Sequence, residues 1–154
     1  MPASTPPTDF MAFQDLLSDE ERLVREQASQ LVDAEVLPVI DAHAQAQTFP
    51  RQLVRRMGEL GFYGPTLPPR YGCAGATSVA AGLLMYELER GDSAIRSFAS
   101  VQGSLVMYPI FAYGSEAQKD HWLPRLARGE AVGCFGLTEP DFGSNPAGLR
   151  TRAV

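Results

Sequence analysis

Apolar residues recur three and four positions apart through most of the first 130 residues, which is the spacing of helices with one buried face. Ser18-Asp-Glu-Glu21 is a capping-box pattern, and apolar positions at helical spacing follow it through Val36. These features predict a long helix that starts at Ser18. The helix should kink or restart at Pro38, because proline lacks the N–H group that a helix interior needs.

The next two helices are marked by their ends. One should begin at Pro50, which suits a first helical turn, and stop at Gly61. Another should run from Ser78 to Gly91, after a loop rich in glycine and proline over residues 64–75.

The segment after Asp92-Ser93 is unusually apolar as far as Phe111, which predicts a central helix buried on several sides. Ser115-Glu-Ala-Gln118 is a second capping box and should open a shorter helix. We expect Pro124 to bend or end that helix and Gly129 to close it.

Over residues 131–138 the spacing of apolar residues changes to that of a strand, and a polar turn containing glycine follows. The predicted fold class is therefore all-α: a helical bundle whose last residues form the first strand of a β-domain. Residues 1–12 are rich in proline and predict a flexible N-terminus.

Composition narrows the class of protein. The chain is 45% hydrophobic and 20% charged, enough for one core in 154 residues. Its net charge of −5, without a basic block, argues against nucleic acid as a partner. No apolar run approaches the ~20 residues of a membrane span, and the first residues lack the features of a leader peptide, so we expect a cytoplasmic protein. Cys73 and Cys134 stand far apart without paired histidines, and no metal site is expected.

The most informative stretch is Cys134-Phe-Gly-Leu-Thr-Glu-Pro-Asp-Phe-Gly-Ser144, followed by Asn145-Pro146. It resembles the flavin-binding signature of acyl-CoA dehydrogenases. Further segments make the chain similar to the glutaryl-CoA dehydrogenase branch, from about Phe13 to the last residue. They are Gly64-Pro-Thr, Glu87-Leu-Glu-Arg90, Asp92-Ser93, Arg96-Ser97 and Ser104-Leu-Val-Met107.

The resemblance implies an N-terminal helical domain over 13–130 and the start of a middle β-domain over 131–154. Members of that family are more than twice as long and carry the catalytic glutamate in a C-terminal bundle, so the chain looks like an N-terminal portion of an enzyme. No catalytic residue is expected in it, and the isolated chain is expected to be inactive. The resemblance also implies FAD as cofactor, an electron-transfer flavoprotein as electron acceptor, and a homotetramer when complete.

For the cofactor, the resemblance implies contacts from the segment after the predicted strand. Backbone N–H groups near Leu137 and the Thr138 hydroxyl can donate to the oxygens and nitrogens along one edge of a flavin ring. Gly136 and Gly143 permit close backbone approach, and Ser144 can also meet the thioester. The implied cofactor-binding residues are Phe135, Gly136, Leu137, Thr138, Gly143 and Ser144.

For the substrate, the resemblance assigns Arg96 to the distal carboxylate of a glutaryl chain, with help from Ser97, Ser100 and Glu89. A guanidinium can hold a carboxylate through two parallel hydrogen bonds. The alternative is a surface or structural role, in which Arg96 pairs with Glu89 seven residues earlier.

The implied reaction oxidises glutaryl-CoA and releases its distal carboxylate as carbon dioxide, leaving crotonyl-CoA. Ala94-Ile95 stands where Gly-Tyr usually precedes the arginine, and Ile95 would suit the wall of a pocket for a neutral acyl chain. A dehydrogenase for a neutral acyl-CoA is therefore one alternative. A non-catalytic, truncated helical module is another.

Overall fold

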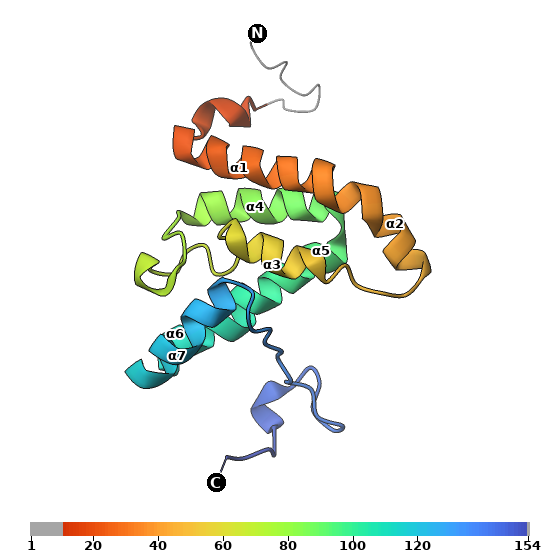
Figure 1. Cartoon of the computed structure of the whole chain (residues 1–154). Helices are drawn as coiled ribbons and strands as arrows, with labels where there is room; N and C mark the ends of the chain where they lie inside the picture. The colour runs from red at the N-terminus through yellow and green to blue at the C-terminus, as the bar shows by residue number, and fades with distance from the viewer. Residues whose placement is uncertain (1–10, 154) are drawn as a thin grey trace.

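The computed structural model describes residues 11–153, so most of the predicted flexible segment 1–12 lies outside the described residues. The elements confirm the predicted all-α class (Figure 1). In chain order they are η1 (Phe13–Leu16), α1 (Asp19–Leu31), η2 (Val32–Val36), α2 (Leu37–Gln45), α3 (Gln52–Glu59), η3 (Pro69–Tyr71), α4 (Ser78–Gly91), α5 (Ser93–Ser100), η4 (Val101–Met107), α6 (Tyr108–Tyr113), α7 (Glu116–Ala127) and η5 (Pro146–Gly148). No helix among the described residues is long and apolar enough to cross a membrane.

Both capping boxes form as predicted. The Ser18 hydroxyl accepts from the Glu21 amide at 3.3 Å, and the Glu21 carboxylate accepts from the Ser18 amide at 3.0 Å. Ser115 and Gln118 make the same reciprocal pair at 3.3 and 2.8 Å. Because each box satisfies two backbone donors that the helix leaves free, these local residues decide where α1 and α7 begin.

Two helical stretches, η2 and η4, have the wider turn of a π-helix, and each lies just before a proline. Pro38 follows η2 at the start of α2, and Pro109 follows η4 at the start of α6. A widened turn accommodates the proline ring, which would otherwise clash with the carbonyl four residues earlier. The restart predicted at Pro38 is thus confirmed. Pro124, in contrast, does not end α7, which continues to Ala127.

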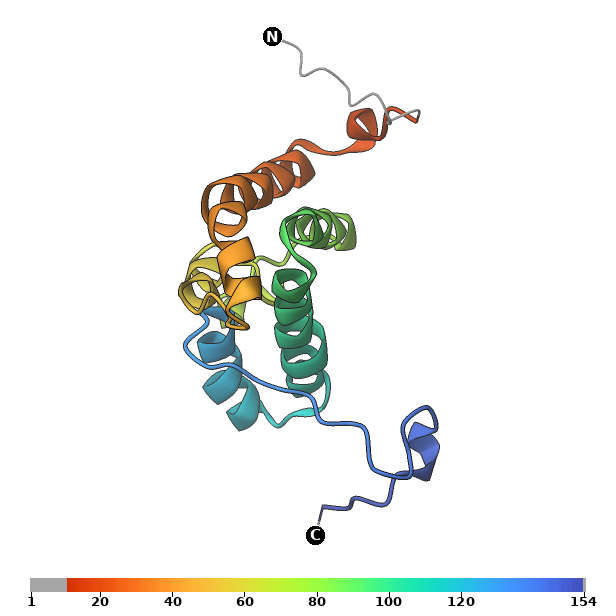
Figure 2. The same cartoon turned by 90° about the vertical axis from the view of Figure 1, so that its right-hand side faces the viewer.

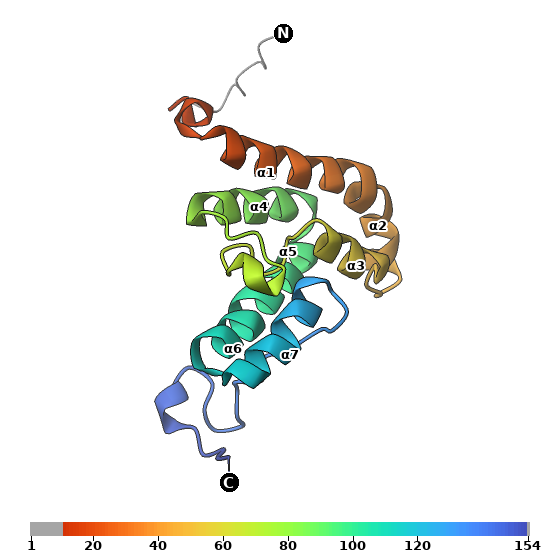
Figure 3. The same ribbon diagram turned by 60° about the vertical axis from the view of Figure 1, so that its left-hand side comes forward.

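The helices pack in pairs that lie side by side. Helix α1 lies along α4, and α5, η4 and α6 form one continuous rod that descends from the end of α4 (Figures 1 and 3). Helix α7 returns beside α6. The core between these layers contains large side chains that are almost fully buried, including Tyr63, Tyr71, Leu53, Met57, Leu84, Leu88, Ile95, Met107 and Leu123. The predicted burial of the central rod holds for one face, since Leu105 and Tyr108 are exposed.

A buried carboxylate joins α1 to α4. Glu87 is 3% exposed, and its two oxygens accept from Nε of Arg25 and Nε of Arg90, each at 2.8 Å. Arg90 also donates to Asp33 in η2 at 2.8 Å. A charge removed from water needs such partners, so the three segments are held in one relative position.

The strand predicted over 131–138 does not form. Within the described residues the only β-pairing is a single bridge between Glu139 and Phe142. We call residues 131–153 the C-terminal tail; Figure 2 shows it crossing the central rod and then leaving the bundle. The physical reason is that a strand is stabilised by hydrogen bonds to a neighbouring strand, and the described residues provide none.

The far part of the tail folds on itself. Glu139 accepts from the amides of Arg150 and Thr151 at 2.9 and 2.8 Å, and the Thr151 hydroxyl donates to it as well. The hydrogen bond from the Thr151 side chain, together with these backbone amides, lowers the pKa of Glu139. The Arg150 guanidinium lies 5.3 Å from the centre of the Phe142 ring. These contacts make a compact local loop after the extended segment.

Two helical glycines should respond oppositely to a methyl group. A Cβ at Gly58 in α3 would lie 2.4 Å from the backbone carbon of Arg128, whereas a Cβ at Gly82 in α4 would meet nothing within 4 Å. We expect Gly58→Ala to lower the free energy of unfolding by about 1–3 kcal/mol through overpacking. Gly82→Ala should raise it by about 0.5–1 kcal/mol, because glycine loses more backbone entropy in a helix. Urea unfolding followed by circular dichroism measures both; equal effects would contradict the close α3–α7 contact.

Candidate functional site

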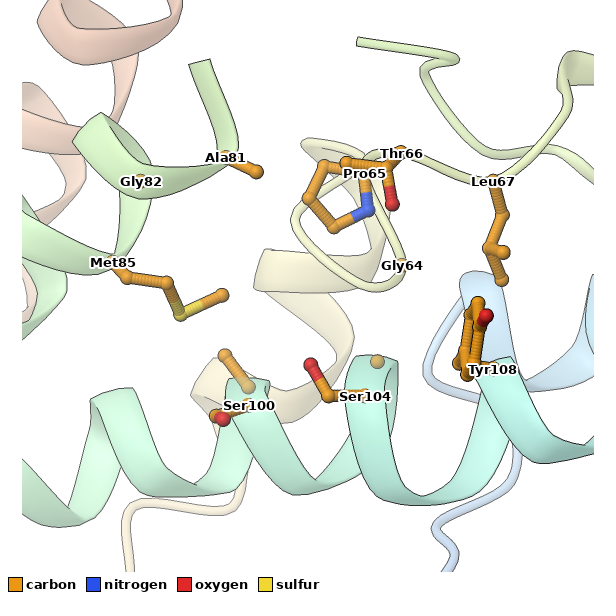
Figure 4. A pocket seen from close by; sticks show the side chains of 12 residues that line it. Gly64, Pro65, Thr66, Leu67, Ala81, Gly82, Met85, Ser100, Ser104 and Tyr108 are labelled. Atoms are coloured by element: carbon orange, nitrogen blue, oxygen red, sulfur yellow. The ribbon is translucent and has the colours of Figure 1, made fainter. Parts of the chain in front are cut away.

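A cavity of about 310 Å³ lies between α4, the central rod and the loop after α3 (Figure 4). Its walls are mostly small or apolar residues, with hydroxyl groups on the side of the rod. They are Gly64, Pro65, Thr66, Leu67, Ala81, Gly82, Met85, Ala99, Ser100, Gly103, Ser104 and Tyr108. In Figure 4, Met85 extends from α4 and Ser104 from η4 into the space between these elements.

Two glycines bring the loop against the rod. A Cβ at Gly103 would lie 2.9 Å from the Gly64 amide nitrogen, so a larger residue in η4 would push the loop away. Gly64 itself has φ +57°, a conformation that favours glycine, and its carbonyl accepts from the Leu67 amide at 2.9 Å. The local turn and the close approach therefore form one wall of the cavity.

A charged pair bridges α4 and α5 next to this cavity. Arg96 Nε donates to Glu89 Oε2 at 2.6 Å, and the Ser93 hydroxyl donates to Glu89 Oε1 at 2.6 Å. Glu89 lies one helical turn beyond Met85, and Arg96 lies one turn before Ser100; both reference residues line the cavity. Residues four apart share a helix face, so the pair lies beyond the end of the cavity where α4 and α5 join.

The geometry leaves part of Arg96 available. Its side chain is 36% exposed, and among the described residues its two Nη groups donate to no protein atom. The hydrogen bond from Arg96, followed by that from Ser93, lowers the pKa of Glu89. The ion-pair alternative for Arg96 is thus present in the structure, yet the pair leaves the end of the guanidinium free to bind an anion.

The other predicted substrate residues do not all lie at the cavity. Ser100 lines the cavity, whereas Ser97 is half-buried and lies outside the lining. Ser144 is exposed in the tail, and no described tail residue lines the cavity. Ile95 is fully buried in the core, so the expectation that it forms a pocket wall is wrong. Its side chain packs into the core, so it is not available to contact a neutral acyl chain.

The predicted cofactor residues lie together in the exposed part of the tail. Phe135 and Leu137 are 49% and 41% exposed, and the backbone amides of residues 134–138 donate to no atom of the described chain. A Cβ at Gly143 would lie 3.8 Å from the Thr138 methyl, so these two predicted residues are neighbours. Free amides beside a hydroxyl are the donor set that a flavin edge requires, and the segment fits FAD in its chemistry.

Sequence reasoning missed Gln102, a buried side chain of η4 that bonds to both α7 and the tail. The only signal was a polar residue within an apolar helical segment. It also missed Met85 and Ser104 as cavity residues, because their place depends on how α4 and the rod cross.

Comparison with known proteins agrees with this arrangement. Residues 18–130 match the family described as "Acyl-CoA dehydrogenase, N-terminal domain". Because the match covers most of the chain, the protein belongs to the acyl-CoA dehydrogenase family. The helical domain described above is that family's N-terminal domain.

Among the similar proteins is the glutaryl-CoA dehydrogenase of Desulfococcus multivorans, 36% identical over 140 residues, which are 89% of this chain and 36% of that protein. A crystal structure of a glutaryl-CoA dehydrogenase from Mycobacterium smegmatis with FADH2 is 52% identical, with a TM-score of 0.88 over 92% of this chain and 36% of that one. A glutaryl-CoA dehydrogenase in complex with glutaryl-CoA is 36% identical, with a TM-score of 0.82, covering 86% and 34%. The chain thus spans about a third of the length of these relatives.

The Arg96–Glu89 pair can be tested by titration. Since the pKa of Glu89 is lowered in the folded chain, the pair stabilises the fold above the unfolded pKa of glutamate, and this contribution is lost as the pH falls through the lowered value. Arg96→Met should raise the pKa of Glu89 towards its ordinary value, and Ser93→Ala should raise it less. NMR titration of the Glu89 carboxyl carbon measures both. An unchanged pKa in Arg96→Met would mean that the pair does not form in solution.

Proposed function

We propose that this chain supplies the acyl-end pocket and part of the flavin contact surface of an enzyme that oxidises an acyl-CoA thioester, with glutaryl-CoA as its substrate. One observation carries the proposal: Arg96 lies one helical turn before Ser100, which lines a cavity of about 310 Å³, and its Nη groups donate to no atom of the described chain. The family membership supports the reaction type.

The proposed pocket divides its work between shape and charge. The small residues Ala81 and Gly82 leave room for a methylene chain, and the Ser100 and Ser104 hydroxyls can donate to oxygen atoms at either end of that chain. Arg96 would hold the distal carboxylate by its free nitrogens. Glu89 keeps Nε engaged and so orients the fork of the guanidinium.

FAD is the cofactor of this family, and when bound it supplies the hydride acceptor for oxidation of the acyl chain. In this chain we assign its contacts to the predicted residues Phe135–Thr138, Gly143 and Ser144. Their amides and hydroxyls would donate to one edge of the ring and stabilise negative charge there. Loss of the distal carboxylate as carbon dioxide would then leave crotonyl-CoA.

The partners follow from the same proposal. An electron-transfer flavoprotein would take the electrons, and the enzyme would assemble as a homotetramer. The base that removes the α-proton is proposed to lie outside this chain. The cytoplasmic location and the domain division at residues 130 and 131 stay predictions.

One observation favours a second candidate, a dehydrogenase for a neutral acyl chain. The cavity lining is mainly apolar, and Glu89 already neutralises part of the Arg96 charge. The two candidates differ in whether Arg96 contributes to substrate binding, and this difference is measurable.

A chimera makes that measurement practical: residues 1–154 replace the matching portion of the Mycobacterium smegmatis glutaryl-CoA dehydrogenase, the 52% identical relative. In this chimera Arg96→Met should lower kcat/KM for glutaryl-CoA by roughly a hundredfold or more, about 3–5 kcal/mol, because the substrate carboxylate loses its partner. The value for butyryl-CoA, which carries no distal charge, should change little.

Two controls accompany that measurement. Arg55→Met removes a charge from the exposed face of α3 and should leave both substrates unaffected. Arg96→Lys keeps the charge but loses the planar fork, and should fall between wild type and Arg96→Met. Equal losses for both substrates would make Arg96 structural, and unchanged values for both would favour the neutral-chain candidate.

The isolated chain should neither retain flavin nor oxidise acyl-CoA, because one exposed edge cannot enclose an isoalloxazine ring. We expect purified 154-residue chain to be colourless after incubation with FAD and gel filtration, and inactive with glutaryl-CoA. Chain that elutes yellow and is bleached by glutaryl-CoA would contradict the division of the site proposed above.

A further inference from the structure

Gln102 is the most completely bonded buried side chain of the central rod. It is 1% exposed, and its amide nitrogen donates to the carbonyls of Leu126 at 3.0 Å and Ala131 at 2.8 Å. Its amide oxygen accepts from the Gly133 amide at 3.0 Å. Every polar atom of the side chain is therefore used, and two of its three bonds go to the tail.

These partners fix the orientation of the amide group. Turning it by 180° would place the oxygen against two carbonyl oxygens and the nitrogen against an N–H group. Leaving a buried amide without partners costs free energy, so the side chain keeps this one orientation. The tail backbone is held where it can form the bonds from Ala131 and Gly133 to Gln102.

A second, independent contact constrains the same point of the tail. A Cβ at Gly133 would lie 2.3 and 2.7 Å from the two methyl carbons of Val106, one turn further along the rod. The tail backbone thus crosses the rod at a distance that only glycine permits. Beyond it, the amides of residues 134–138 make no hydrogen bond within the described chain, so these contacts set the direction in which that segment leaves the bundle.

We propose that Gln102 is a positioning residue that, together with the Gly133–Val106 contact, aims residues 134–144 at the flavin. The inference rests on the proposed function for the identity of what that segment contacts. Gln102 itself would touch neither cofactor nor substrate. It would act by holding the backbone of Ala131 and Gly133, the residues with which the tail begins.

Amide hydrogen exchange on the 154-residue chain tests the anchoring without flavin. In Gln102→Met, exchange at Gly133 should be roughly tenfold faster or more, because one hydrogen bond is lost, while amides within α4 keep their rates. Val32→Ala, a buried change in η2, is the matched control: it should speed exchange in the bundle without a specific effect at Gly133. Unchanged exchange at Gly133 in folded Gln102→Met would overturn the proposal.

A second pair of variants keeps the test decisive if Gln102→Met does not fold. Gly133→Ala displaces the tail while Gln102 is intact. Adding Val106→Ala removes the methyl groups at 2.3 and 2.7 Å and leaves only the Val106 Cβ at 3.0 Å, so protection at position 133 should return in large part. Protection that is already normal in Gly133→Ala, or that does not return in the double variant, would contradict the close crossing.

The link to the cofactor is tested in the Mycobacterium smegmatis chimera by the dissociation constant of FAD. Gly133→Ala and Gln102→Met should weaken FAD binding roughly tenfold or more, the double Gly133→Ala, Val106→Ala variant should recover part of it, and Val32→Ala should bind as wild type does. If the variants bind FAD as tightly as wild type, the positioning role is overturned. If the wild-type chimera binds no FAD, the proposed function fails, whereas the exchange result on the chain still decides whether Gln102 anchors the tail.

Discussion

The widened turn of η4 holds the tail, the loop at Gly64 and the cavity wall in one arrangement. Consecutive residues of this turn meet different parts of the molecule: Gln102 bonds to α7 and the tail, Gly103 touches the loop at Gly64, and Ser104 lines the cavity. We attribute the widened turn to Pro109, because the widened stretch ends just before this proline. One local distortion therefore places the cavity wall and the exit of the tail relative to each other.

Charge acts at the junction of α4 and α5 in two ways. Glu87 faces inward and is buried between two arginines, which holds α1 and α4 together. Glu89, two residues later, faces the other side of α4 and holds Arg96 beside the cavity. Both oxygens of Glu87 are bonded to arginines within the bundle, whereas Arg96, the partner of Glu89, keeps free donors at the end of its guanidinium. A short acidic stretch of one helix thus serves stability on one face and the proposed recognition of an anion on the other.

The sequence predicted those features that depend on neighbouring residues and missed those that depend on distant ones. The starts of α1 and α7 were predictable because Ser18 and Ser115 satisfy helix donors three residues away. The strand at 131–138 was predicted from its apolar pattern but requires a partner strand that the described residues lack. Ile95 was assigned to a pocket from its type alone, and only the crossing of α5 with the core shows that it is buried there. The partners of Gln102 lie 24 and more residues away, which no local pattern reveals.

In the proposed enzyme, the cavity between α4 and the central rod receives the acyl chain, with Arg96 beyond the end where α4 and α5 join. A crystal structure of the Mycobacterium smegmatis chimera with bound glutaryl-CoA tests this most directly. We expect methylene groups beside Met85 and Ser100, and a distal carboxylate within hydrogen-bond distance of the Arg96 Nη groups. An acyl chain that lies outside this cavity, or a distal carboxylate bound by other residues while Arg96 pairs with Glu89 alone, would contradict it.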